Sequence, residues 1–342
     1  MSEIDMSQQP IVDLSEKTEL LSRRQRFFKL MKTSKFWKNI IGKIFVYTVL
    51  TDFALVFILP ILYMVVTGIE SPIDFADENV VWIPKRAFYT DNIRSGFYAL
   101  DYWNTIWYTV KIVGLCTLGH IFSGALVGYA LGRLKFTGRG FIFALVLLTL
   151  IVPAQALSTS TYRIFITTEF LGMKNWPEIY RIVVPCFLGC GLNGGIFIFV
   201  FRQVYAGLPK ELEEAAMIDG CDIFQTFRRI MLPLTSSAVL VCIILSVVWH
   251  WNDLFEPIMY IKSLNPNKPT LMSVRMYYTF MNGSSIFATF FVNSDGKLSS
   301  TEYKGQQPMM WCTFLSLAPI LIMYMLVQKY FMASVASTGI KG

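Results

Sequence analysis

The residue types that most often perform chemistry are few in this 342-residue chain and form no familiar catalytic pattern. The two histidines, His120 and His250, are far apart in the sequence, which argues against a histidine-rich metal site. No Ser/His/Asp set, histidine cluster or carboxylate pair is arranged for catalysis, and the G-x-x-x-x-G-K-[ST] loop that binds nucleoside triphosphates is absent from the sequence. We therefore expect a protein that is not an enzyme and that holds no metal or cofactor of its own.

The composition indicates that much of the chain lies in a membrane. Hydrophobic residues make up 54% and charged residues 15% of it, and the mean hydropathy is +0.50. Soluble proteins average roughly 45–50% apolar and about 25% charged residues. Since a bilayer is crossed by about 20 mostly apolar residues, and backbone groups in lipid must bond within their own segment, we predict an all-α polytopic protein with six transmembrane helices. The predicted spans are 44–66, 106–131, 141–165, 182–205, 234–261 and 309–332.

Lysine and arginine predict the orientation, because cytoplasmic loops carry an excess of both. Residues 23–43 contain eight basic and no acidic side chains, and they form either an amphipathic helix on the anionic leaflet or a basic anchor. Both termini should therefore be cytoplasmic. The predicted parts are a basic arm at 1–43, a six-helix domain at 44–333 and a tail at 334–342, so the net charge of +7 reflects topology and does not indicate nucleic-acid binding.

Five of the six cysteines fall in predicted spans, and Cys221 falls in a cytoplasmic loop. Cys186 and Cys190 would share a helix face because they are four residues apart. Small residues at such positions allow close helix contacts in a membrane, and we favour this interpretation over a metal or redox role.

A polar loop at 206–233, between the fourth and fifth spans, contains residues typical of helix starts and helix ends. Pro209 suits the first position of a helix, and the glutamates that follow suit its positive N-terminal end. Gly220 fits a left-handed C-terminal cap, and Asp222 is a good N-cap for a second helix. We predict two short helices around a glycine, the first narrow enough to enter a groove in a partner.

In the same loop, Glu214-Ala215-Ala216 is followed after three residues by Gly220, and after nine more by Ile230-Met231-Leu232-Pro233. This spacing resembles the EAA motif of ABC importer permeases. The surrounding sequence LPKELEEAAMIDG is most similar to carbohydrate-uptake permeases of the maltose type. Four other segments also resemble sequences of this family: GYALGRLKFTGRG, LTLIVPAQ, WHWNDLFEPIMYI and the final YFMASVASTGIKG. Segment 279–308 is longer than in the family.

The resemblance implies a type I ABC importer permease in a bacterial cytoplasmic membrane. Its partners would be a homologous sister permease, two ABC ATPase subunits that bind ATP and Mg, and an extracellular solute-binding protein. ATPase closure would reach the membrane through the loop. The residues that the resemblance assigns to this contact are Leu212, Glu213, Glu214, Ala215, Ala216, Asp219, Gly220, Ile230 and Pro233. A second ATPase contact would involve Ser337, Thr338, Gly339 and Lys341 in the tail.

Polar residues inside the spans are candidates for the solute path or its gate, because such groups are costly in lipid. Gln155 and Asn193 should lie near the midplane, where broken or glycine-rich helices often line a path. Trp251, Asn252 and Asp253 should lie near the outer surface, and for these we favour a structural or gating role over direct solute contact.

The leading functional prediction is ATP-driven import of a carbohydrate, with an oligosaccharide as the best fit to the resemblance. One alternative is a polyamine or phosphate-containing solute carried by the same architecture. A stand-alone secondary transporter is less favoured because it would not need the helix–glycine–helix loop, and a membrane enzyme is least favoured of all.

Overall fold

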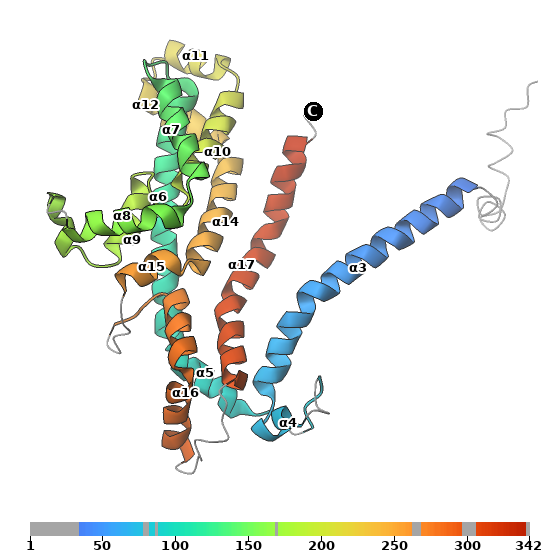
Figure 1. Cartoon of the computed structure of the whole chain (residues 1–342). Helices are drawn as coiled ribbons and strands as arrows, with labels where there is room; N and C mark the ends of the chain where they lie inside the picture. The colour runs from blue at the N-terminus through green and yellow to red at the C-terminus, as the bar shows by residue number, and fades with distance from the viewer. Residues whose placement is uncertain are drawn as a thin grey trace, which may run out of the picture. The chain divides into compact units, whose positions relative to one another are not determined.

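The computed structural model describes residues 34–77, 82–85, 88–167, 170–261, 268–295 and 306–339, and every regular element in these ranges is a helix (Figure 1). The chain divides into two compact units, 1–63 and 64–342, which are described separately. The first contains most of α3 (Ser34–Ile69), a helix whose apolar side chains are almost all exposed, as expected for a surface in contact with lipid. Because α3 begins at Ser34, no break separates the predicted basic arm from the first span.

Three helices in the described ranges are long and apolar enough to cross a bilayer: α3, α6 (Tyr102–Arg133) and α17 (Gln306–Gly339). A fourth candidate is the pair 223–234 and 236–252, which is bent by 73°. These described helices establish three or four candidate spans, so the predicted count of six is not confirmed.

The predicted third and fourth spans are not continuous helices. Between α7 (Arg139–Ile151) and α8 (Ala154–Thr167) the chain breaks at Pro153, which lacks a backbone N–H and clashes with the preceding turn. Between α9 (Tyr180–Phe187) and α10 (Gly194–Gly207) it turns through Gly189 and Asn193, whose φ values are +75° and +54°. In Figure 1, α7 and α10 follow α6, whereas α8 and α9 lie across it.

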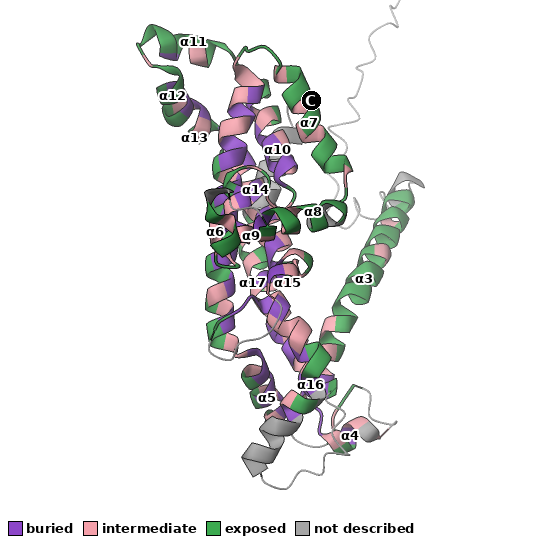
Figure 2. Ribbon diagram, turned by 60° about the vertical axis from the view of Figure 1, so that its left-hand side comes forward, coloured by how far each residue is buried: buried purple, intermediate pink, exposed green. Residues whose placement is uncertain are grey.

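Helix α6 is the centre of the second unit, and α9, α10 and α14 (Ser236–Asn252) pack against it. A side chain at Gly128 would lie 2.6 Å from Phe201 Cβ, so the glycine allows α6 and α10 to approach closely. The hydroxyls of Thr117 and Ser246 are 2.9 Å apart and connect α6 to α14. Figure 2 shows buried residues along these helices and exposed residues over α11 and α7.

A smaller hydrophobic cluster lies near the N-terminal end of α6. There α5 (Thr90–Leu100) and α16 (Met272–Asp295) pack with the start of α17 around Leu100, Met272, Phe287 and Cys312. The sequence predicted no helix between the first and second spans or between the fifth and sixth spans. The structure instead places α4 (Pro72–Ala76), α5 and a 24-residue α16 in these connections.

Candidate functional site: the loop between α10 and α14

The two short helices and their caps predicted for the loop are confirmed, with one difference in where the first helix begins. Helix α11 (Glu211–Ile218) begins two residues after Pro209, not at the proline. Gly220 has a φ of +84°, a conformation that glycine adopts without a steric penalty. Asp222 caps α12 (Ile223–Thr226) in a capping box with Gln225. The chain then continues through a π-helical turn, η2 (Phe227–Met231), and α13 (Leu232–Leu234) to α14.

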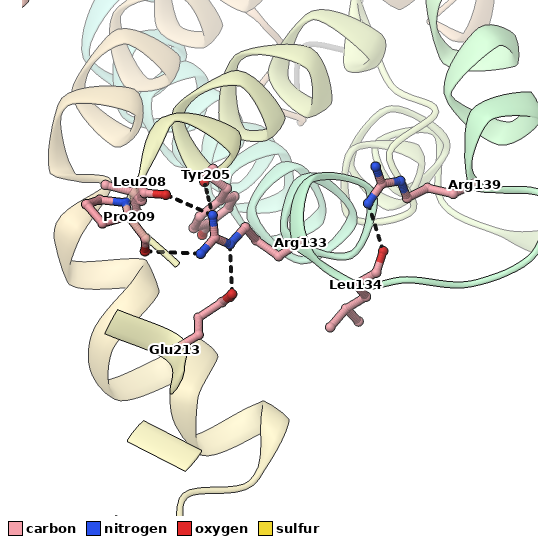
Figure 3. A network of polar contacts seen from close by, with 7 residues as sticks. All are labelled: Arg133, Leu134, Arg139, Tyr205, Leu208, Pro209 and Glu213. Atoms are coloured by element: carbon pink, nitrogen blue, oxygen red, sulfur yellow. Dashed lines mark hydrogen bonds and ion pairs between the residues drawn. The ribbon is translucent and has the colours of Figure 1, made fainter. Parts of the chain in front are cut away.

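Arg133, the last residue of α6, holds the start of this loop (Figure 3). Its Nε donates to Glu213 Oε2 at 2.8 Å. Its Nη1 donates to the carbonyls of Leu208 at 2.9 Å and Tyr205 at 3.4 Å, and its Nη2 to that of Pro209 at 3.1 Å. One guanidinium therefore binds the end of α10, the connecting turn and the first turn of α11, using the fork of donors that only arginine presents.

The Arg133–Glu213 ion pair is largely removed from solvent, with side-chain exposures of 5% and 15%. Glu213 therefore makes a contact inside its own chain, while the adjacent Glu214 is exposed. The sequence did not predict this contact. The two residues are 80 positions apart, so nothing in the local pattern could pair them.

The surface of the two short helices is unusually apolar. Ile218 is 86% exposed, and Met217, Ile223 and Phe224 are all more than half exposed. Among the residues assigned to the ATPase contact, Ala215 is exposed, Leu212 is at the limit of exposure and Ala216 is buried against the protein. The four more exposed residues were not predicted because they fall between the fixed positions of the motif, although their apolar type in a polar loop could have indicated them.

The remaining loop residues assigned from the resemblance differ in exposure. Asp219, Gly220 and Pro233 are exposed, whereas Ile230 is half-buried against the cluster around Phe227 and Met231. An open hollow of about 630 Å³ separates α11 from the α6–α7 connection. It is lined by Arg133, Lys135, Arg139, Lys210, Glu213 and Glu214, together with apolar neighbours.

The structure does not bring the predicted path residues together with this loop. Trp251 is buried, and its Nε1 donates to the Ser316 carbonyl at 3.1 Å, which ties α14 to α17. Asp253 Oδ1 accepts from the backbone N–H groups of Phe255 and Glu256 at the start of α15 (Phe255–Tyr260).

The other path candidates are less constrained. Asn252 donates to the Val248 carbonyl of its own helix and is exposed, as is Asn193 in its left-handed turn. Gln155 lies on α8, but its side chain is outside the described part. In the tail, 334–339 continue α17 as helix, including Ser337, Thr338 and Gly339. The side chains of Ser337 and Thr338 and the whole of Lys341 are outside the described part.

Residues 124–337 match the family described as the binding-protein-dependent transport system inner membrane component. The match covers more than half of the chain and includes α11 and the Arg133–Glu213 ion pair. The chain belongs to this family. The resemblance to ABC importer permeases drawn from the loop is thereby confirmed, and the permease is embedded in a membrane.

Named relatives of the permease extend over most of its length. It is 28% identical over 277 residues to the arabinooligosaccharides transport system permease protein AraQ of Halalkalibacterium halodurans, covering 81% of this chain and 84% of the relative. It is 25% identical over 288 residues to the diacetylchitobiose uptake system permease protein DasC of Streptomyces coelicolor, covering 83% and 92%.

One solved structure shares the fold. It is a chain of a bacterial ABC transporter involved in the import of the acidic polysaccharide alginate, with a TM-score of 0.62 and 20% identity. The similarity covers 86% of this chain and 98% of the other.

Proposed function

We propose that this permease imports a carbohydrate, and specifically an oligosaccharide, with energy from ATP hydrolysed by separate ABC ATPase subunits. Relatives named for arabinooligosaccharide and diacetylchitobiose uptake support the substrate class. In this proposal the chain is non-catalytic, pairs with a sister permease and receives solute from an extracellular binding protein. ATP and Mg are held by the ATPase partners.

The coupling proposal rests on the exposed apolar surface of α11 and α12, which Arg133 holds in place at the start of the loop. Ile218 and Phe224 are exposed on short helices whose entry is fixed by four Arg133 hydrogen bonds. An apolar surface on a rigid support suits a groove in a partner. The ATPase would press on α11, and Arg133 would pass the displacement to α6, against which α9, α10 and α14 pack.

We further propose that the chain crosses the membrane six times with both termini in the cytoplasm. Two crossings would be discontinuous, one made of α7 with α8 and the other of α9 with α10. Neither α7, with 13 residues, nor α10, with 14, reaches the ~20 residues of a full crossing. Discontinuous helices of this kind are frequent at transport sites, which keeps Asn193 and Gln155 as candidates for the path and Trp251, Asn252 and Asp253 for its gate.

The test is uptake by the assembled transporter, purified with its co-purifying subunits and reconstituted in liposomes with its binding protein. We expect ATP-dependent uptake of labelled oligosaccharides, and no uptake when the permease is reconstituted without an ATPase. Uptake driven by a polyamine or a phosphate compound, with no response to any sugar, would contradict the substrate class. Transport by the permease alone would contradict the coupling proposal.

A further inference from the structure

The structure brings the two distant histidines together with two cysteines in the middle of the helix bundle. His120 Nε2 and His250 Nε2 are 3.1 Å apart, although the sequence separates them by 130 residues. Cys186 Sγ lies 3.8 Å from His250 Nε2. The ligand atoms of Cys116, Cys186 and His250 all lie within 4.8 Å of one another. The separation of the two histidines in the sequence therefore does not argue against a metal site here.

We propose that Cys116, Cys186 and His250 form a structural zinc site, with His120, which lies outside that group of three, moving in as the fourth ligand. In a tetrahedral site with Zn–S of about 2.3 Å and Zn–N of about 2.0 Å, neighbouring ligand atoms lie roughly 3.3–3.8 Å apart. The separations of 3.1 Å from His120 Nε2 and 3.8 Å from Cys186 Sγ to His250 Nε2 are close to this range. Zinc prefers sulfur and nitrogen ligands in this geometry, whereas calcium and magnesium require oxygen ligands, which this cluster does not offer.

The ligands come from three helices that the ion would join. Cys116 and His120 are four residues apart on α6 and so share one face, while Cys186 is on α9 and His250 on α14. Cys116, Cys186 and His120 are fully buried, and His250 is 6% exposed. His120 also stacks on Phe197 with ring centroids 4.2 Å apart, which fixes the plane of its imidazole.

Charge favours zinc over monovalent copper at this depth. The cluster lies near the middle of α6, away from both ends of a candidate span. Zn²⁺ bound to two thiolates and two neutral imidazoles has no net charge, because the two thiol protons are released on binding. A monovalent copper ion with the same ligands would leave one negative charge in a region where charge is costly. The buried Nδ1 of His120 has no hydrogen-bond partner among the described residues, so a bond at Nε2 would be the imidazole's main polar contact.

Metal content of the full-length permease, purified with its partner subunits under reducing conditions and without chelators, tests the site. We expect about one zinc ion per permease chain in elemental analysis. Cys116→Ser and Cys186→Ser should each lower zinc affinity by at least about tenfold. Cys242→Ser is the matched control, because Cys242 is equally buried on α14 but outside the cluster, and it should retain zinc.

Cobalt provides a second measurement that does not depend on how the variants fold. Wild-type permease loaded with Co²⁺ should show thiolate-to-cobalt charge transfer and the visible bands of a tetrahedral ion. Absence of zinc and of this spectrum after metal loading would overturn the proposal. A disulfide between Cys116 and Cys186 in the native protein, or equal metal loss in the Cys242 variant, would overturn it too.

Discussion

At the scale of single residues, Glu213 and Glu214 are neighbours with different surroundings. Glu213 is paired with Arg133 and mostly buried, while Glu214 faces solvent. The motif could identify the pair as important, but sequence alone could not separate the glutamate that braces the loop from the one free to meet a partner. That distinction depends on Arg133, which is 80 residues away in the sequence, so the residues around the two glutamates do not indicate it.

Replacing Arg133 should therefore lower the stability of the fold more than an ordinary surface substitution does. Arg133→Ala leaves the Glu213 carboxylate largely buried without its partner, and we expect the free energy of unfolding to fall by about 3 kcal/mol. The double variant Arg133→Ala/Glu213→Gln removes the stranded charge and should recover part of the loss. Denaturant unfolding in mixed micelles measures both values.

Arg139→Ala is the control for this pair, because Arg139 binds the Leu134 carbonyl and not the loop. It should change stability by less than about 1 kcal/mol. If the double variant were as unstable as Arg133→Ala, the buried charge would not be the cause of the loss.

Gly220 offers a second test at a single residue. Space around it is open, so only its φ of +84° restricts substitution. Gly220→Val places a β-branched residue in the left-handed region, at a cost of about 1–2 kcal/mol or more, and should uncouple ATP hydrolysis from uptake. Gly220→Asn is the control, since asparagine enters this region more readily and should retain most coupling. Equal uptake by wild type and the valine variant would refute a requirement for this turn.

At the scale of elements, the sequence predicted where the short loop helices begin and end, but it did not predict where the apolar spans are interrupted. The helix–glycine–helix loop was predictable because Gly220 and Asp222 act on their own backbone, and this local chemistry is visible in the sequence. The breaks at Pro153 and Gly189 were not predicted, because an apolar run of sufficient length resembles a span whether or not it turns. Helix α16 was missed because its polar residues resemble a loop, and its burial depends on α5 and α17.

The exposed surface of α11 and α12 should determine ATPase binding. Ile218→Asp places a charge on an 86% exposed side chain, so it should leave the fold intact and reduce co-purification of the ATPase at least tenfold, or about 1.4 kcal/mol. Glu214→Lys should also weaken coupling without changing stability. Glu211→Gln, an exposed change on the same helix, is the control. Full ATPase recovery with the aspartate variant would exclude this surface as the docking site.

At the scale of the whole molecule, the discontinuous segments leave a choice that labelling can decide. If α7–α8 and α9–α10 are two crossings, then Lys174 between them lies outside the cell. If they form a re-entrant hairpin, Lys174 does not reach the outside. We propose the first arrangement, because the segment between α8 and α9 also contains the exposed, charged Glu178, which is costly within lipid.

Single cysteines at exposed positions test this topology in intact cells. A membrane-impermeant maleimide should label Lys85→Cys and Lys174→Cys from outside, and Asp219→Cys only in inside-out vesicles. Wild type, with its native cysteines, provides the background. Labelling of Lys85→Cys without Lys174→Cys would favour the hairpin, and external labelling of Asp219→Cys would invert the predicted orientation.

The turn between α9 and α10 has a mechanical consequence for transport. Its backbone bonds to itself, with Cys190 N–H donating to Pro185 at 2.9 Å and Gly194 N–H to Gly191 at 2.8 Å. Ser123 Oγ on α6 also donates to the Cys186 carbonyl at 2.8 Å. A turn that is bonded in this way is an elbow of fixed angle and not a hinge, because bending it would expose backbone groups to lipid. Helices α6, α9 and α10 should therefore travel as one rigid body, and the flexible joints of the transport cycle must lie elsewhere.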